Sequence, residues 1–346
     1  MTKSLLFSAG FGVLFSSLLF SPASQARSVN AVPTPTPPTM QNADPSPTPT
    51  PNAEDDVIKI DTELVNLNVK VVDRFNRPIN NVPQSDFSIF EDNVPQQIEF
   101  FSRAEVPTNY SLVIDNSGSI RSQIDKVIDA GKILVATNRP DDETSVIRFI
   151  SSDKIEVLQS FTSNIEDLNY ALDNMYIEGG QTAIIDAVYL AATTVNDYDN
   201  KTKNVDRKRR ALVVVSDGED RDSYYSEAQL FELLRETDVQ IYTIGFVGDL
   251  SKERGFISKS PQGKAKAFLE RMAKETGGKS YFPGSINDLA GIATEIGAEL
   301  RTQYSIGYIP TNDRPDGTFR NIRVSIKDGP DKQKRIAVTK AGRVAQ

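Results

Sequence analysis

The chain has 346 residues, of which 38% are hydrophobic and 25% are charged, enough for one large or two medium-sized domains. It contains no cysteine and no histidine, which excludes disulfide bonds, zinc sites of the Cys/His type and Ser-His or Cys-His catalytic sites. The formal net charge of −8 argues against a nucleic-acid-binding protein, whose affinity depends on Lys and Arg side chains that neutralise phosphates.

Residues 1–26 have the pattern of a secretory signal peptide. Lys3 supplies the positive start, residues 5–20 the apolar core, and Ser24-Gln25-Ala26 a small-x-small cleavage site. An uncleaved anchor is the alternative, but the core is shorter than the ~20 apolar residues that a spanning helix requires. We therefore expect an exported protein, whether periplasmic, cell-surface or secreted, with no membrane span after cleavage.

Residues 27–56 are a linker rich in proline and threonine. They include the runs Pro-Thr-Pro-Thr-Pro-Pro and Pro-Ser-Pro-Thr-Pro-Thr-Pro. Proline at this density favours an extended polyproline conformation without a core of its own. We expect this segment to be a disordered spacer.

The two ends of the remaining chain both read as β-structure. Apolar and polar residues alternate between Thr62 and Arg103, which is typical of half-buried strands. Strand-like segments return at 304–309, 322–326 and 336–338. About three strands at either end are too few for a stable sandwich, whereas together they approach the ~100 residues of an immunoglobulin-like domain. We expect residues 57–106 and 303–346 to be the two halves of one all-β sandwich.

Between residues 107 and 302 strands and helices alternate, which indicates a doubly wound, mainly parallel sheet covered by helices on both faces. The expected strands are 110–114, 145–150, 154–161, 211–215, 239–246 and 279–282. The expected helices are 120–137, 165–175, 183–195, 227–237, 265–275 and 286–301. Ser163 and Ser285 occupy helix-start positions, and Gly277 marks a helix end. The basic run at 207–210 is expected to be a solvated loop.

The first of these strands leads into Asp115-Asn116-Ser117-Gly118-Ser119. Asp115, Ser117 and Ser119 therefore lie on a strand-to-helix turn with oxygen atoms at alternate positions. Such a turn suits a hard divalent cation, because Mg²⁺ and Ca²⁺ prefer oxygen ligands. The alternative is a structural turn, in which Asp115 stabilises the backbone and Ser119 caps the next helix.

Two more oxygen-bearing side chains are expected near this turn. Thr182 ends the loop Gly179-Gly180-Gln181 at the start of a helix, and Asp217 follows the buried strand 211–215. In an open parallel sheet, ligands bind beyond the carboxyl ends of the strands, where Asp115 and Asp217 both lie.

Asp115-x-Ser117-x-Ser119, Thr182 and Ser216-Asp217-Gly218, in this order, resemble the von Willebrand factor A-type (VWA) domain and its metal-ion-dependent adhesion site (MIDAS). The segments 273–278 and Asp86-Phe87-x-x-x-Glu91-Asp92 are also similar to a group of exported bacterial VWA-related proteins.

The resemblance implies a Rossmann-like sheet of strand order 3-2-1-4-5-6 that binds Mg²⁺, or Mn²⁺ or Ca²⁺. It implies hydroxyl ligation by Ser117, Ser119 and Thr182, with Asp115 and Asp217 bound directly or through water. An acidic residue of a protein partner would complete the coordination.

Some residues after Asp217 allow two interpretations. Glu219, Asp220 and Asp222 either line the metal site or, as an acidic stretch ahead of a helix, interact favourably with the dipole at the start of that helix. Tyr224 and Tyr225 either contact a partner or pack back against the protein.

We therefore expect an exported, metal-dependent protein-binding module of the adhesion type that is not an enzyme. A metal-assisted phosphoester hydrolase, or a phosphotransferase with Asp115 as nucleophile, is the first alternative. Aspartyl-phosphate enzymes carry Asp-x-Asp at such a turn, however, whereas position 117 is Ser, and the chain has no histidine to act as a base. A structural envelope protein with an idle site is the second alternative.

Overall fold

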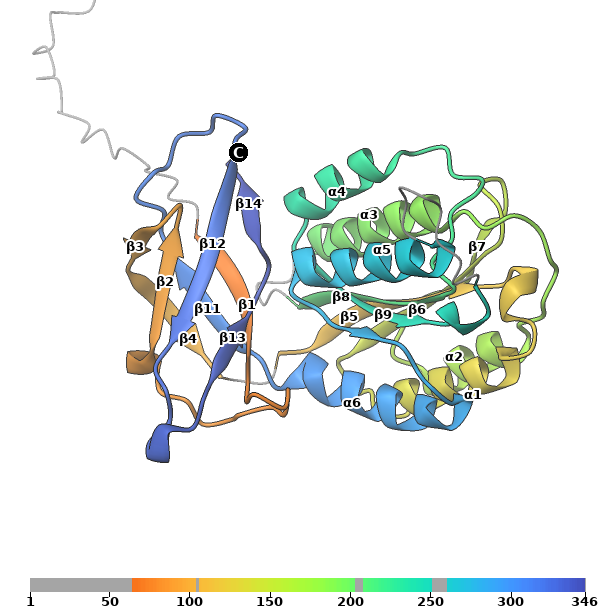
Figure 1. Ribbon diagram of the computed structural model, residues 1–346, viewed down its shortest axis with the longest axis horizontal. Helices are drawn as coiled ribbons and strands as arrows, with labels where there is room; N and C mark the ends of the chain where they lie inside the picture. The colour runs from red at the N-terminus through yellow and green to blue at the C-terminus, as the bar shows by residue number, and fades with distance from the viewer. Residues whose placement is uncertain (1–63, 104–105, 203–207, 251–259, 346) are drawn as a thin grey trace, which may run out of the picture. The chain divides into compact units, whose positions relative to one another are not determined.

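The computed structural model describes residues 64–103, 106–202, 208–250 and 260–345, so the expected signal peptide and linker lie outside the described residues. The described chain forms a central α/β domain and a unit of two antiparallel sheets, here called the two-sheet unit (Figure 1). No helix within these ranges is long and apolar enough to cross a membrane.

The central domain is built on a six-stranded sheet of order β10-β9-β8-β5-β6-β7. Its strands are β5 (Thr108–Asp115), β6 (Glu143–Phe149), β7 (Ile155–Thr162), β8 (Arg209–Ser216), β9 (Val239–Gly245) and β10 (Ser280–Tyr281). All neighbours are parallel except β6 and β7. Counted from β5, this is the order 3-2-1-4-5-6, which confirms the mainly parallel, doubly wound sheet.

Helices cover both faces of this sheet (Figure 1). They are α1 (Ile124–Val135), α2 (Ile165–Asp173), α3 (Ile184–Thr202), α4 (Glu227–Glu236), α5 (Pro261–Thr276) and α6 (Leu289–Arg301). Short 3-10 turns occur at Gly118–Ile120, Val247–Asp249 and Ile286–Asp288. Residues of α1, α2 and α6 share one apolar cluster with the sheet, and residues of α3, α4 and α5 share the other. Both faces of β5 and β8 are buried, and the carboxyl halves of these strands read as the apolar runs 112–114 and 211–215.

The cap of α2 and the starts of α1 and α5 differ from the sequence prediction, and α5 begins at Pro261 instead of residue 265. The cap of α2 is Asn164 and not Ser163, because the Asn164 side chain accepts the main-chain N–H of Glu166 at 3.0 Å. The helix expected from residue 120 begins only at Ile124, because the preceding turn closes an i to i+3 bond from Arg121 to Gly118.

The expectation of a solvated basic loop is wrong for Arg209 and Arg210, which are buried in β8. The guanidinium of Arg209 donates to the main-chain oxygens of Leu300, Arg301 and Gln303 at 2.8–3.2 Å. A cation at this position satisfies carbonyl groups that the end of α6 leaves without helical partners.

Each sheet of the two-sheet unit combines strands from both ends of the chain. One has the order β13-β1-β11-β4 and the other the order β14-β12-β2-β3, with antiparallel neighbours throughout. The strands are β1 (Val65–Val72), β2 (Phe87–Glu91), β3 (Val94–Gln96), β4 (Ile98–Ser102), β11 (Tyr304–Tyr308), β12 (Phe319–Ile326), β13 (Ile336–Val338) and β14 (Gly342–Val344), with 3-10 turns at Gln84–Asp86 and Pro330–Lys332. Both sheets contribute to one buried apolar cluster, while the immunoglobulin-like character of the unit stays a prediction.

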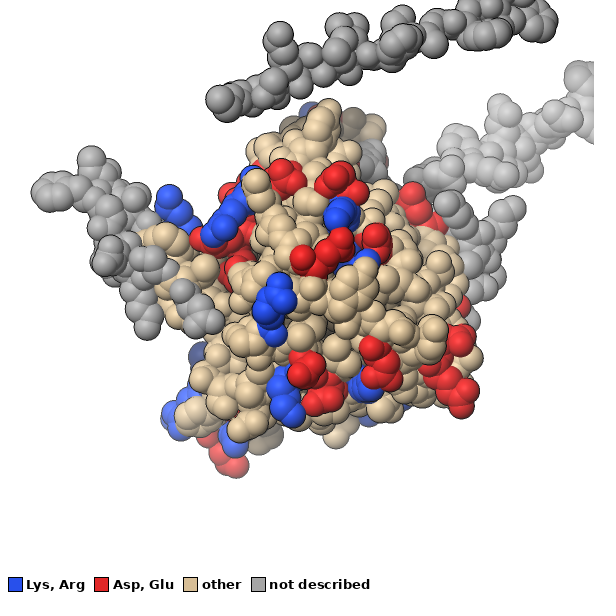
Figure 2. Space-filling model, turned by 90° about the vertical axis from the view of Figure 1, so that its right-hand side faces the viewer, with Lys and Arg blue, Asp and Glu red and all other residues tan. Residues whose placement is uncertain are grey.

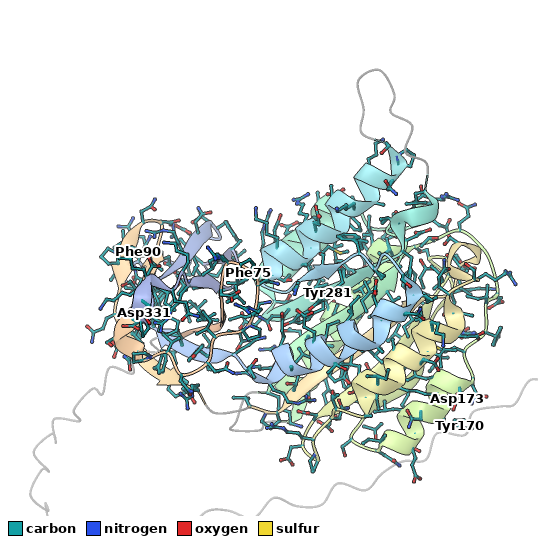
Figure 3. The ribbon with its side chains drawn as sticks, turned by 60° about the horizontal axis from the view of Figure 1, so that its bottom comes forward. Phe75, Phe90, Tyr170, Asp173, Tyr281 and Asp331 are labelled. Atoms are coloured by element: carbon teal, nitrogen blue, oxygen red, sulfur yellow. The ribbon has the colours of Figure 1, made fainter. Side chains whose placement is uncertain are left out.

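Ion pairs also join the two ends. The three acidic residues of the segment 86–92 each pair with an arginine from the C-terminal strands or their connections. The pairs are Asp86–Arg335 at 2.9 Å, Glu91–Arg343 at 3.0 Å and Asp92–Arg320 at 3.9 Å. Glu91 is buried and also accepts the hydroxyl of Tyr308 at 2.5 Å. Phe75 and Phe90 belong to this unit (Figure 3). The guanidinium groups of Arg77 and Arg323 lie over their rings at 5.3 Å and 4.1 Å from the ring centres.

The two-sheet unit contacts the central domain at the amino ends of the parallel strands. Lys70 of β1 forms a buried ion pair with Glu299 of α6 at 2.5 Å. Ala341, which precedes β14, donates its N–H to the carbonyl of Glu275 in α5. The carboxyl ends of β5 and β8 therefore lie at the opposite pole and are not covered by the two-sheet unit (Figure 1).

We expect Arg343→Ala to destabilise the two-sheet unit although it lies near the end of the chain. Removing one partner of a buried ion pair leaves Glu91 uncompensated, which lowers the free energy of unfolding by ~3–5 kcal/mol. Urea denaturation measures the loss. Lys334→Ala is the control, because its partner Asp328 is also exposed and such pairs contribute ~0–1 kcal/mol. Equal stability of the two variants would contradict the assignment of a buried pair.

Candidate metal site

The five residues predicted to bind a cation lie on three chain segments at the carboxyl edge of the central sheet. Asp115 ends β5, Asp217 follows β8, and Thr182 precedes α3. Since β5 and β8 are neighbouring parallel strands, their carboxyl ends meet at the same edge. The Ser216 hydroxyl at the end of β8 donates to Asp115 Oδ2 at 2.7 Å, which joins the first and third segments directly.

The first segment turns sharply after β5. Asp115 Oδ1 accepts the main-chain N–H of Ser117 at 2.8 Å, and the hydroxyls of Ser117 and Ser119 lie 2.7 Å apart. Neither the 3-10 turn at 118–120 nor α1 has a side-chain cap, so Ser119 does not cap either of them. The structural-turn interpretation therefore accounts for Asp115 but not for the paired hydroxyls.

The second segment brings Thr182 to the same edge through two glycines. Gly179 and Gly180 have φ values of +84° and +136°, which favour glycine, and a Cβ on Gly180 would lie 2.6 Å from a methyl group of Ile150. Thr182 is buried, and its carbonyl accepts the N–H groups of Arg221 at 2.8 Å and Asp222 at 3.3 Å. These bonds join the second segment to the third.

The third segment turns at Gly218, whose φ is +78°. Asp217 is buried, and its Oδ1 accepts the N–H of Glu219 at 2.9 Å. A Cβ on Gly218 would approach Leu269 within 2.9 Å, so the loop packs closely against α5.

Asp115 is fully buried, and burial raises the pKa of its carboxyl group to about 6. Hydrogen bonds from Ser117 and Ser216 oppose this increase, while the nearby charge of Asp217 adds to it. Within the described residues, neither Asp115 nor Asp217 forms an ion pair with Lys or Arg. Two neighbouring carboxylates in a protein interior require a positive partner or a proton.

This donor set fits a hard divalent cation. Carboxylate and hydroxyl oxygens are the ligands that Mg²⁺ accepts, and a cation between the two buried carboxylates would offset their mutual repulsion. Across the described ranges there is no cluster of three or more carboxylates arranged to hold a metal ion, so a cation here would depend on hydroxyl ligands as well. Bound at this edge, the cation would keep an open coordination position for an oxygen ligand from another molecule, since Mg²⁺ prefers six ligands and five side chains are available.

The acidic residues after Asp217 bind main-chain and hydroxyl groups. Asp220 accepts the N–H of Ile185 at the start of α3, so it interacts with the amino end of α3 and not with that of α4, the helix that follows it in sequence. Asp222 accepts the N–H of Ser152 at 3.2 Å. Tyr225 packs back against the protein with its ring stacked on Tyr189 at 3.9 Å.

Tyr224 differs from its neighbour, since 83% of it is exposed. It is therefore available for contact with another molecule. Around this pole of the central domain, acidic and basic side chains are interspersed without a large patch of one sign (Figure 2).

Sequence reasoning missed two residues that organise the site. Ser216 orients Asp115, although the sequence marks it only as the first residue of the Ser-Asp-Gly motif. Asn116 donates its side-chain N–H to the carbonyl of Tyr176 at 2.6 Å, which joins the first and second segments. No sequence signal marks Asn116, because its acceptor is a main-chain atom 60 residues away.

Comparison with known proteins gives one family. The family model of the von Willebrand factor type A domain matches residues 111–295, whereas no curated protein sequence matches the chain.

Solved structures from several organisms are similar to part of this chain. An aerotolerance-related membrane protein from Bacteroides fragilis is 19% identical, with 56% of this chain and 99% of that chain covered and a TM-score of 0.41. BatB from Bacteroides thetaiotaomicron is 18% identical, with 56% and 98% covered and a TM-score of 0.41. Proximal thread matrix protein 1 from the mussel byssus, with a zinc-occupied MIDAS motif, is 17% identical, with 57% and 48% covered and a TM-score of 0.44.

We expect Mg²⁺ or Mn²⁺ at millimolar concentration to stabilise the protein by ~1–3 kcal/mol when its concentration is well above the dissociation constant. Asp115→Asn should abolish this response. In chelator, however, the variant should melt at or above the wild-type temperature at pH 7.5, because it removes a buried charge near Asp217. Differential scanning calorimetry with and without metal measures both effects. A metal-induced shift retained in Asp115→Asn would remove Asp115 from the site.

Proposed function

Because the chain belongs to the von Willebrand factor type A domain family, we propose that it is a metal-dependent protein-binding module. A divalent cation, Mg²⁺ or alternatively Mn²⁺ or Ca²⁺, is held by Asp115, Ser117, Ser119, Thr182 and Asp217. An acidic residue of a protein partner supplies the remaining ligand.

The observation that carries this proposal is the pair of buried carboxylates at neighbouring strand ends, with hydroxyl groups beside them. Asp115 and Asp217 are 0% and 3% exposed, and no basic side chain within the described residues pairs with either. A cation held by two carboxylates and neutral hydroxyls keeps its affinity for further oxygen ligands, since Mg²⁺ prefers six. A carboxylate from a partner fills this requirement better than a neutral group.

The chemistry of the site favours binding over catalysis. The chain contains no histidine, and position 117, where an aspartyl-phosphate enzyme would carry a second aspartate, is serine. Both carboxylates at this edge, Asp115 and Asp217, are assigned to the cation in this proposal, so neither is free to act as a general base. Catalysis at this edge would require a general base close to the substrate, in addition to the residues that bind the cation.

The proposal includes a domain plan and a location. The central domain, residues 107–302, is inserted into an immunoglobulin-like sandwich formed by residues 57–106 and 303–346. Residues 1–26 direct export, and residues 27–56 are a spacer to a periplasmic, cell-surface or secreted domain. Strand pairing between the two ends supports the insertion, because β1 pairs with β11 along five residues.

Binding to a partner should depend on metal. We expect immobilised protein to retain an acidic partner from an extract of the source cell's envelope in Mg²⁺ and to release it with EDTA. Asp115→Asn should retain none of it, because the metal-carboxylate bond cannot form. Asp173→Asn is the matched control, since Asp173 is an exposed carboxylate on α2 outside the three segments (Figure 3). Retention that is equal in EDTA and Mg²⁺ would refute the proposed function.

A further inference from the structure

Asn116 lies between two of the proposed ligands but is not one of them. It is completely buried, and its main-chain N–H donates to the carbonyl of Phe149 at 2.8 Å. Its side-chain Nδ2 donates to the carbonyl of Tyr176 at 2.6 Å. The orientation of the amide follows from this contact, because the reverse orientation would place two oxygen atoms against each other.

The other end of the Asn116 amide has no partner. Its Oδ1 is buried and makes no hydrogen bond to the described residues. A buried polar atom left unpaired lowers stability, so a small apolar residue would serve better if position 116 only filled space. The hydrogen bond to the Tyr176 carbonyl therefore explains why an asparagine occupies this position.

Tyr176 begins the loop that ends at Thr182, and its own side chain is held independently. The guanidinium of Arg148 lies 4.5 Å from the centre of the Tyr176 ring and donates to its hydroxyl at 3.2 Å. Two residues further on, Glu178 pairs with Lys154 at 2.6 Å. The loop thus has a side-chain attachment to β6 and the turn after it, and a main-chain attachment to Asn116.

The bond from Asn116 closes a ring of contacts around the site. Ser216 joins the third segment to the first, and the carbonyl of Thr182 joins the second to the third. The first and second segments are joined by the Asn116 amide. Gly179 and Gly180 lie between Tyr176 and Thr182, so the position of Thr182 depends on the contacts of its loop with both other segments.

We propose that Asn116 is a positioning residue that holds Thr182 in register with the ligands of the first turn. This inference rests on the proposed metal site. Asn116 acts through a side-chain N–H donated to a main-chain carbonyl, so aspartate, which has the same shape but only acceptor oxygens, cannot replace it. Residues that orient metal ligands in this way typically change metal affinity by ~10–100-fold when they are substituted.

The test is a double-mutant cycle on the full chain, with Mn²⁺ as the probe and electron paramagnetic resonance as the measurement of free ion. Asn116→Ala and Asn116→Asp should each weaken Mn²⁺ binding by ~10–100-fold. In a Thr182→Ala background the same changes should weaken it by less than about twofold, because the group they position is gone. Asn174→Asp is the matched control and should bind Mn²⁺ like the wild type, since the Asn174 amide donates the same kind of bond to the main-chain carbonyl of Tyr170 outside the three segments.

The outcomes separate this inference from the proposed function. Wild type that binds no Mn²⁺ refutes the metal site and this inference with it. Wild type that binds Mn²⁺ while the Asn116 variants bind it equally tightly overturns the positioning role alone. So does a loss that is as large in the Thr182→Ala background as in wild type, which would mean that Asn116 acts on the fold in general. Melting in chelator confirms folding, and Asn116→Asp stands in the cycle if Asn116→Ala does not fold.

Discussion

Two carboxylates of like charge lie in the protein interior at the end of the central strands, and the local structure is arranged around this constraint. Asp115 accepts one main-chain N–H and one hydroxyl, and Asp217 accepts a main-chain N–H. These contacts fix the direction of each carboxylate but do not neutralise it. The hydrogen-bond donors are neutral groups, so they orient the carboxylates but leave their negative charge unbalanced. A bound cation would supply the balancing positive charge.

The rigidity that this arrangement needs comes from the sheet. β5 and β8 are buried along their whole length, with apolar clusters on both faces. At the other end of β8, Arg209 is buried as well and is bound to carbonyl groups at the end of α6. One strand therefore carries a fixed charge at each end, with the apolar core between them.

The α/β domain follows from the sequence because its signals are local. Apolar runs predict the strands, and the rule that ligands bind at their carboxyl ends predicts that Asp115 and Asp217 lie together. The cap of α2 was assigned to Ser163 instead of Asn164 because serine and asparagine both make good caps, so their order along the chain does not decide between them. Arg209 was predicted to lie in a solvated loop because it belongs to a basic run. It is instead the first residue of the buried central strand β8.

Contacts between distant residues explain the other misses. Asn116 binds a main-chain oxygen of Tyr176, and main-chain acceptors carry no sequence signal at all. The acidic residues of the segment 86–92 stand out in the sequence, but their arginine partners lie more than 220 residues away. A sequence shows that such charges exist, whereas only the fold decides which of them meet.

The pairing of β1 with β11 also determines how the protein would respond to a pulling force. The two strands are antiparallel, with Val65 opposite Tyr308 and Val69 opposite Tyr304. A force applied at the metal site enters the sheet at Tyr304 of β11 and at Ser102 of β4, which lies opposite Ser305, whereas a force from the segment before β1 enters at Val65. The two forces act at opposite ends of the paired strands and draw them past each other. All the hydrogen bonds of the pair then resist together, instead of opening one after another as in a zipper.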